Sequence, residues 1–323
     1  MMRWATLAGL IGLALATWLM IDHGWSAIAA ALAAAGWGVV WASAFHVVPM
    51  ALNARAWQLL VPVLRRPPSL GTFTWLVWVR EAVNGLLPVA RVGGEIVTAR
   101  LLIKQGMRSA PAVASLVSDM TITIFTQFVF TLIGLAILLC YGDVQDLVLR
   151  VGVGAALAIP ILVAMIMVQR IGFFGLFQRL VRAIAGERWA VLAGSGARFD
   201  SAIRLSYRRP GRVVVSFAWQ LAGWTAASLE IWLACRFLGF PLSVVQAVLI
   251  ESLIQAVASA AFVIPGALGV QEGGFLLLGG IVGMPPEIAL ALALCRRARD
   301  VMVFVPALVL WQAGEGRRLL AAR

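Results

Sequence analysis

Apolar residues occur in long runs along most of the chain, and each run ends at a short group of charged or turn-forming residues. Runs of about twenty apolar residues are long enough for a helix to cross the hydrocarbon core of a bilayer. A membrane barrel would instead show alternating segments of about ten residues, and the sequence has no such alternation. The pattern predicts six full spans, at about residues 5–21, 36–54, 110–139, 147–168, 213–236 and 287–312.

Two further apolar segments, residues 70–108 and 241–286, are interrupted near the middle by proline and glycine. The first contains LLPVARVGGE and the second contains FVIPGALGVQEGG. Proline removes a backbone donor and breaks a helix, whereas glycine accepts turn conformations that other residues resist. Because unpaired backbone groups cannot face lipid, such a break must be buried in protein or lie against water. We therefore expect two re-entrant hairpins whose tips lie inside the protein.

The two hairpins share a spacing of proline and glutamate. Aligning Pro88 with Pro265 also aligns Glu95 with Glu272, and a glycine pair adjoins each glutamate. Interrupted helices at corresponding places in two halves of a chain are typical of transporter binding sites. The expected spans bring the hairpins into the membrane from opposite faces, so the pattern predicts an all-α polytopic protein with an inverted repeat.

A basic segment divides the chain into two halves. Residues 169–212 carry nine arginines against two acidic residues, and residues 173–192 form an amphipathic pattern. That pattern fits a helix lying on anionic lipid, and it fits equally a loop helix packed on the protein. We expect a first membrane half at 1–168, a cytoplasmic connector at 169–212 and a second membrane half at 213–323.

The composition excludes a soluble domain, since 62% of the residues are hydrophobic and only 12% are charged. The net charge of +12 would suggest nucleic acid as the partner of a soluble protein. Here the arginines gather in the loops that the positive-inside rule places in the cytoplasm, against anionic lipid. The sequence predicts a multi-pass membrane protein with both termini cytoplasmic and no nucleic-acid partner. The first apolar run also resembles a cleaved signal peptide, but another span follows soon and we expect it to be retained.

This topology makes a prediction about accessibility. A cysteine introduced at Ser195, in the expected cytoplasmic connector, should resist an impermeant thiol reagent in intact cells and react after the cells are opened. The native Cys140, Cys235 and Cys295 are first replaced by serine or alanine so that only the new thiol reports. Ready labelling in intact cells would show that the protein has the opposite orientation and that each hairpin enters from the opposite face.

The titratable residues limit the chemistry. The chain has two histidines, His23 and His46, and three cysteines without the spacing of a metal site or a disulfide framework. It also lacks the G-x-x-x-x-G-K-[ST] phosphate loop of nucleotide-driven pumps. We therefore expect no metal and no cofactor, and any coupling energy should come from an ion gradient.

Charged and polar residues recur inside the apolar runs at helical spacing, where each costs about 3 kcal/mol or more unless it meets a partner or water. Arg296 and Asp300 lie four residues apart in the last span, so we expect them to pair. A single ion pair of this kind can have a purely structural role. A set of such pairs is harder to explain in that way, because apolar residues would fill a protein core at lower cost. The groups are Arg80, Glu81 and Asn84; Ser115, Asp119, Thr123 and Gln127; Glu230; Glu251, Gln255 and Ser259; and Arg296, Arg299 and Asp300.

These motifs, with the later RRARD, resemble the membrane family typified by the transmembrane half of lysylphosphatidylglycerol synthase, over roughly residues 5–312. LIESLIQAVASAAFVIPGALGVQEGGF and VPALVLWQ resemble its branch associated with hopanoid biosynthesis. The resemblance implies a lipid-translocating fold with re-entrant hairpins around a central cavity, and a role with hopanoids. It points to Pro88, Gly93, Gly94, Glu95 and Arg100 in the first motif, and to Pro265, Gly269, Glu272 and Arg296 in the second.

The leading interpretation is a lipid flippase whose partners are membrane lipids. Arg100 and Arg296 would hold the lipid head group, while Glu95 and Glu272 would orient these arginines, bind a cationic group or carry a proton. Only a short tail follows the last expected span, so we expect no aminoacyl-transferase domain and no enzyme activity. A membrane-embedded head-group transferase and a scaffold for lipid-synthesis enzymes are the alternatives. The expected substrate-binding residues are Asn84, Pro88, Gly93, Gly94, Glu95, Arg100, Asp119, Glu251, Gln255, Pro265, Gly269, Glu272, Arg296, Arg299 and Asp300.

Overall fold

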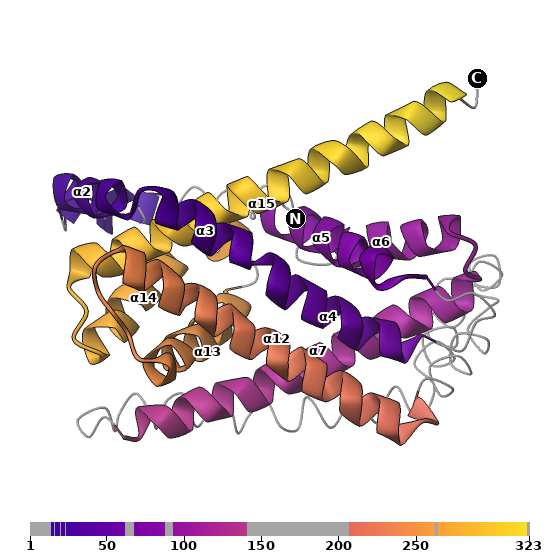
Figure 1. Cartoon of the computed structure of the whole chain (residues 1–323), viewed down its shortest axis with the longest axis horizontal. Helices are drawn as coiled ribbons and strands as arrows, with labels where there is room; N and C mark the ends of the chain where they lie inside the picture. The colour runs from indigo at the N-terminus through magenta and orange to yellow at the C-terminus, as the bar shows by residue number, and fades with distance from the viewer. Residues whose placement is uncertain are drawn as a thin grey trace, which may run out of the picture.

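The described part of the chain is helical. The computed structural model describes residues 24–61, 68–87, 93–140, 207–261 and 264–321, and several positions between 14 and 22. These ranges contain helices and no strand, which confirms the expected all-α class (Figure 1). The expected span at 147–168 and the amphipathic helix at 173–192 lie outside the described residues, as do most of the first span and of the connector.

Three long helices begin within a few residues of expected spans. They are α7 (Ser109–Leu138), α12 (Pro210–Phe237) and α15 (Pro286–Ala321). Among the described residues, α7 is long and apolar enough to cross a membrane by itself. The helices α12 and α15 have 28 and 36 residues but are less apolar than α7, since α12 carries Glu230 and α15 carries the RRARD motif. The total number of spans therefore stays a prediction.

The span expected at 36–54 has different bounds and a helix before it. The structure has α2 (Trp25–Ala35), α3 (Trp37–Phe45) and α4 (Val47–Leu60), with a bend of 74° between α2 and the helices that follow. Gly36 forms the bend with a positive φ of 49°, which glycine adopts without a steric penalty. The sequence of α2, WSAIAAALAAA, is rich in alanine, the residue that most favours a helix. Together, α2 and α3–α4 have the length and apolarity of one broken span.

Both expected hairpins have the helix–break–helix form, although their placement in a membrane stays a prediction. The first consists of α5 (Leu70–Leu86) and α6 (Gly93–Lys104), and the second of α13 (Val244–Ala260) and α14 (Val270–Ile281). In each, a helix of 17 residues packs against a helix of 12 residues. The short 3-10 helix η1 (Pro265–Ala267) lies in the second break, with Gly266 at a φ of 62°.

The two hairpins also begin alike. Ser69 caps α5 by accepting a hydrogen bond from the amide of Thr72. Ser243 caps α13 by accepting one from the amide of Gln246, whose own side chain accepts from the Ser243 amide. Serine side chains at this position satisfy amides that the first helical turn leaves without a backbone partner.

The turns that leave the hairpins match as well. Gly106 follows α6 with a φ of 93°, and Gly283 follows α14 with a φ of 76°. The next residue in each turn, Met107 or Met284, donates its amide to the carbonyl five residues earlier. This is the Schellman arrangement, which ends a helix and turns the chain sharply into the next one.

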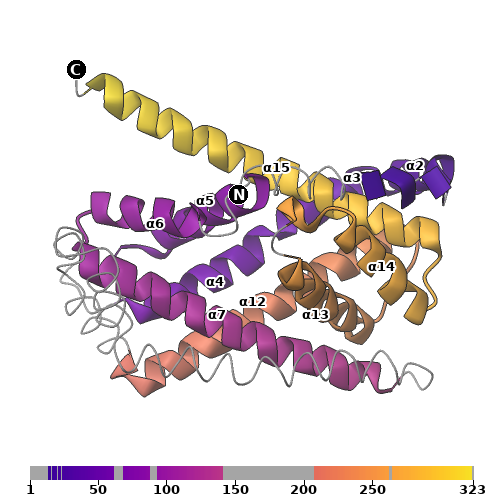
Figure 2. The same cartoon turned by 180° about the vertical axis from the view of Figure 1, so that it is seen from behind.

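Each hairpin packs against the long helix of the other half. The first helix of the first hairpin, α5, packs against α15, whereas α13 packs against α7. Between them, α4 packs along α12, and the two hairpins lie at opposite ends of the molecule in both views (Figures 1 and 2). One apolar core surrounds Phe275 and a second surrounds Trp57. This exchange brings charged residues of both halves together between the helices.

Candidate functional site

Charged and polar side chains from seven of the described helices and from the α3–α4 junction lie together in the interior. We group them into a first-hairpin cluster, a second-hairpin cluster and a histidine cluster. The first-hairpin cluster consists of Arg80, Asn84, Glu95 and Asp119; the second-hairpin cluster of Glu251, Gln255, Glu272, Arg296 and Arg297; and the histidine cluster of His46, Glu81, Glu230, Arg299 and Asp300.

In the first-hairpin cluster, an ion pair joins α5 to α7. Arg80 Nη1 donates to Asp119 Oδ2 over 2.7 Å, and Asp119 is 1% exposed. The guanidinium of Arg80 also lies 5.2 Å from the ring centre of Trp57, a cation–π contact. Because a buried carboxylate is costly without its partner, this pair ties the hairpin to the long helix of its own half.

Asn84 closes the first hairpin by reaching from α5 across the break to two residues of α6. Its side-chain oxygen accepts from the Gly94 amide over 2.8 Å, and its nitrogen donates to both oxygens of Glu95 over 3.2 and 3.1 Å. Gly94 has no room for a side chain, since a Cβ would lie 2.5 Å from the Arg80 carbonyl oxygen. Glu95 also lies in the first turn of α6, where the helix dipole favours a negative charge.

In the second-hairpin cluster, Arg296 pairs with Glu251 and not with Asp300, so the expected pairing within the helix is wrong. Arg296 Nη1 and Nη2 donate to the two oxygens of Glu251 over 2.7 and 2.8 Å, and Glu251 is fully buried. Gln255 donates a further hydrogen bond to Glu251. Two parallel charge-assisted bonds are stronger and more directional than a single contact along one helix face, and they join α13 to α15.

Glu272 organises the break of the second hairpin. One of its oxygens accepts from the amide of Gly269, the residue before α14, over 2.7 Å, and the other accepts from Arg297 Nε over 2.9 Å. Arg297 also donates to the carbonyl of Gly266 over 2.7 Å. The expectation that Glu272 orients Arg296 is therefore wrong, because its arginine partner is the next residue, Arg297. Arg297 Nη2 also lies 2.9 Å from Glu272 Oε1, but it is buried and makes no hydrogen bond.

The histidine cluster joins α5, α12 and α15 to the junction of α3 and α4. His46 Nδ1 lies 2.7 Å from Glu230 Oε2, and His46 Nε2 lies 3.2 Å from Glu81 Oε2. Arg299 donates to Glu230 over 3.0 Å and to the neighbouring Asp300 over 2.6 Å. Asp300 therefore serves Arg299, one residue away, and not Arg296.

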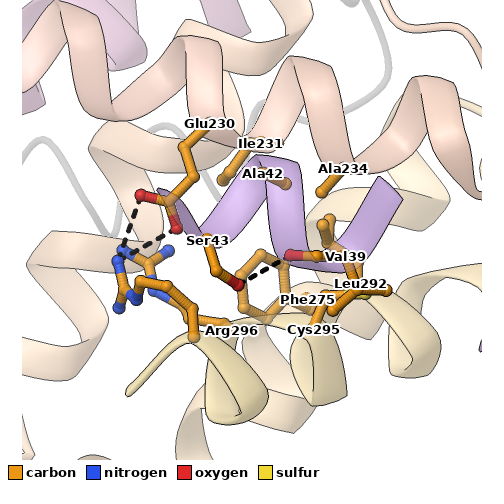
Figure 3. A pocket seen from close by; sticks show the side chains of 11 residues that line it. Val39, Ala42, Ser43, Glu230, Ile231, Ala234, Phe275, Leu292, Cys295 and Arg296 are labelled. Atoms are coloured by element: carbon orange, nitrogen blue, oxygen red, sulfur yellow. Dashed lines mark hydrogen bonds and ion pairs between the residues drawn. The ribbon is translucent and has the colours of Figure 1, made fainter. Parts of the chain in front are cut away.

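A small pocket lies between the histidine cluster and the apolar core of the second half. Ser43, Glu230, Phe275, Arg296 and Arg299 contribute to its lining. In Figure 3, Glu230 reaches toward the pocket from α12, while Ser43 donates to the carbonyl of Val39 on its own helix. The pocket has an apolar wall on one side and charged groups on the other.

The other expected site residues are placed as follows. Arg100 lies apart from the clusters, because its side chain is 68% exposed and its carboxylate neighbour is Glu315 at 3.5 Å. Gly93 begins α6 and Pro265 begins η1, whereas Pro88 lies outside the described residues.

Five residues of the clusters were absent from the expected substrate-binding residues: His46, Arg80, Glu81, Glu230 and Arg297. Arg80, Glu81 and Glu230 had a usable signal, since each is a charged residue inside an apolar run. His46 had none, because one histidine in an apolar run is as consistent with a packed core as with a site. Arg297 adjoins Arg296 in RRARD, and their positions along the chain do not distinguish one from the other.

These features define a helical membrane protein with an ion-paired interior. The family model described as lysylphosphatidylglycerol synthase TM region matches residues 6–307. The chain belongs to this family, which confirms the resemblance seen in the sequence, whereas the hopanoid branch stays a prediction. No curated protein and no solved structure gives a significant match.

Proposed function

We propose that the protein is a lipid flippase that moves an amphiphilic lipid between the leaflets of the bacterial inner membrane. The main support is that both hairpins contribute ionised side chains to the interior of an otherwise apolar helical protein. Ionised groups at such depth are costly and mark substrate or ion pathways in membrane proteins. Membership of a family named for a membrane region of a lipid synthase supports lipid as the substrate class.

Arg297 is the group best suited to receive a lipid head group. All four arginines of the clusters donate to a carboxylate, and Arg297 differs in that its buried Nη2, although 2.9 Å from Glu272 Oε1, makes no hydrogen bond. A phosphate or hydroxyl oxygen would satisfy that donor, and guanidinium groups suit phosphate geometry. We therefore propose a phospholipid or a hydroxylated hopanoid as the substrate, with Arg297 in the role first expected of Arg296.

Lipid movement would proceed by exchange of ion-pair partners. A head group that entered between the helices would replace one member of a buried pair, so no charge need be left alone in a medium of low dielectric. The acyl or ring portion would stay in the lipid beside the hairpins. The ion pairs would then act as gates between the helices, and these gates would open one at a time.

An inverted repeat would let these ion-pair gates open alternately to the two faces of the membrane. The equal helix lengths of the two hairpins, their serine caps and their matching turns support this proposal. The same distance along the chain separates Pro88 from Pro265, Gly106 from Gly283, and Asp119 from Arg296. The last correspondence reverses the sign of the charge, since α7 supplies an acid to α5 whereas α15 supplies a base to α13.

The proposal is tested by replacing the two hairpin glutamates. Glu95→Gln and Glu272→Gln keep the volume and one of the two acceptor oxygens, so each variant should fold and insert. Movement of a fluorescent phosphatidylglycerol in liposomes should fall at least tenfold, a barrier change of about 1.4 kcal/mol, because the carboxylate charge is lost. Lys104→Gln, which removes the pairing of Lys104 with Glu315 away from the clusters, is the matched control and should transport normally.

The same liposomes separate the competing functions. Wild-type protein that chemically alters the labelled lipid would indicate a head-group transferase, and wild-type protein that neither alters nor moves it would indicate a scaffold. Normal transport by both glutamine variants would remove the glutamates from the transport mechanism. Native mass spectrometry of the purified protein would identify the lipid that remains bound.

A further inference from the structure

We propose that His46 binds and releases the proton that drives lipid movement, so that the protein is a proton-coupled transporter. This inference rests on the proposed flippase function and names its coupling ion. His46 stands at the junction of α3 and α4, and its partners come from α5, α12 and α15. It therefore contacts both hairpin-bearing halves of the chain at once.

Both nitrogens of the imidazole face carboxylate oxygens. Nδ1 lies 2.7 Å from Glu230 Oε2 and 3.0 Å from Arg299 Nη1, and Nε2 lies 3.2 Å from Glu81 Oε2. A neutral imidazole has a single N–H, and an ionised carboxylate can only accept. Both contacts can thus be hydrogen bonds only when one further proton is present, on the imidazole or on a carboxyl group. The geometry describes a site that holds this proton between two acceptors.

The charges around His46 favour such a proton. The groups that face it are Glu81 from α5, Glu230 from α12, and Arg299 from α15, which also binds Asp300. Three carboxylates against one guanidinium give the surroundings a formal charge of −2. A proton on His46 reduces the charge of the whole group to −1, which lowers the cost of burying it. The ring of Phe304 meets the imidazole edge-on and excludes water on that side.

The two contacts of the imidazole differ in their access to solvent. The Glu230 side chain is 11% exposed and is fixed by Arg299, whereas the Glu81 side chain is 27% exposed. The proton therefore enters and leaves at Nε2, on the Glu81 side, while Nδ1–H stays bonded to Glu230. Uptake converts neutral His46 into imidazolium, and release returns the proton from Nε2 to water. Because Glu81 lies on α5, release weakens the contact of the first hairpin with α12 and α15.

A pH gradient across proteoliposomes tests this coupling. The vesicles contain phosphatidylcholine and phosphatidylglycerol, with fluorescent phosphatidylglycerol as the probe. A gradient of one pH unit corresponds to a tenfold ratio for one proton. With wild-type protein, the probe should therefore approach an unequal distribution of about ten to one between the leaflets. The direction of the imbalance distinguishes symport from antiport.

His46→Gln removes the proton-binding group and should give an equal distribution under the same gradient. His23→Gln makes the same change at the other histidine of the chain and should keep the wild-type imbalance. Glu81→Gln leaves an acceptor for Nε2–H but removes the charge that retains the proton, so the imbalance should shrink. It serves as the second variant if His46→Gln does not fold.

Nuclear magnetic resonance gives a readout that does not depend on transport. In protein labelled at histidine and carrying His23→Gln, the one remaining imidazole signal should change between the neutral and the imidazolium form as the pH is varied from 5 to 9, about the range in which histidine titrates. Wild-type protein that moves lipid equally with and without a gradient would overturn the coupling and leave the flippase function intact. Wild-type protein that moves no lipid at all would overturn the flippase function, and the coupling with it.

Discussion

Replacing Arg296 with methionine should lower the free energy of unfolding by about 3–5 kcal/mol. The substitution leaves Glu251 fully buried with only the amide of Gln255 as its partner. Unfolding in mixed micelles with increasing SDS measures the change. The double variant Arg296→Met with Glu251→Leu should recover stability to within about 1 kcal/mol, because two apolar side chains replace a buried ion pair at little cost.

Two controls assign the loss to this pair. Arg100→Met removes an arginine that is 68% exposed and should change stability by less than about 0.5 kcal/mol. Adding Asp300→Ala to Arg296→Met should not restore stability, since Asp300 is bonded to Arg299. Rescue by Asp300→Ala, or a single variant as stable as the wild type, would contradict the pairing of Arg296 with Glu251.

Gly94→Ala should destabilise the first hairpin by about 2 kcal/mol, within the usual range for overpacking. A methyl group at this position would lie 2.5 Å from the Arg80 carbonyl and 2.8 Å from the Asn84 amide group. Because the first of these atoms belongs to the backbone, α6 must move away from α5, and the hydrogen bond from the Gly94 amide to Asn84 is lost. Unfolding in SDS and the lipid assay should both detect the change.

The second hairpin supplies the matched control. Gly273 adjoins Glu272 as Gly94 adjoins Glu95, but a Cβ at Gly273 meets nothing within 4 Å. Alanine favours a helix interior over glycine by about 0.5–1 kcal/mol, so Gly273→Ala should be neutral or slightly stabilising. Equal effects of the two substitutions would show that α6 does not approach α5 as closely as the structure has it.

Local sequence signals predicted the elements well where the signal was strong. The starts of α7 and α15 lie one residue from the expected starts, and proline and glycine marked the breaks of both hairpins. The helix α2 was missed because its run of alanines is only weakly hydrophobic, so that hydropathy treated it as a connection between spans. Helix propensity would have found it.

The ion-pair partners of the arginines in α15 could not be predicted from the sequence. Arg296, Arg297 and Arg299 lie within one turn of α15, but each successive residue is rotated by about 100°. Their guanidinium groups therefore meet Glu251, Glu272 and Glu230, which belong to three different helices. Spacing along one helix identifies neighbours on that helix alone, so it suggested Asp300 for Arg296. The choice among acids depends on packing between distant segments.

The short second helix of each hairpin has a consequence for biogenesis. A helix of 12 residues is about 18 Å long, whereas the hydrocarbon core is about 30 Å thick. Neither α6 nor α14 can therefore be released into the bilayer as an independent segment during synthesis. In the predicted re-entrant arrangement, each would enter the membrane together with the 17-residue helix that precedes it. Insertion of either hairpin would then wait until its second helix has been synthesised.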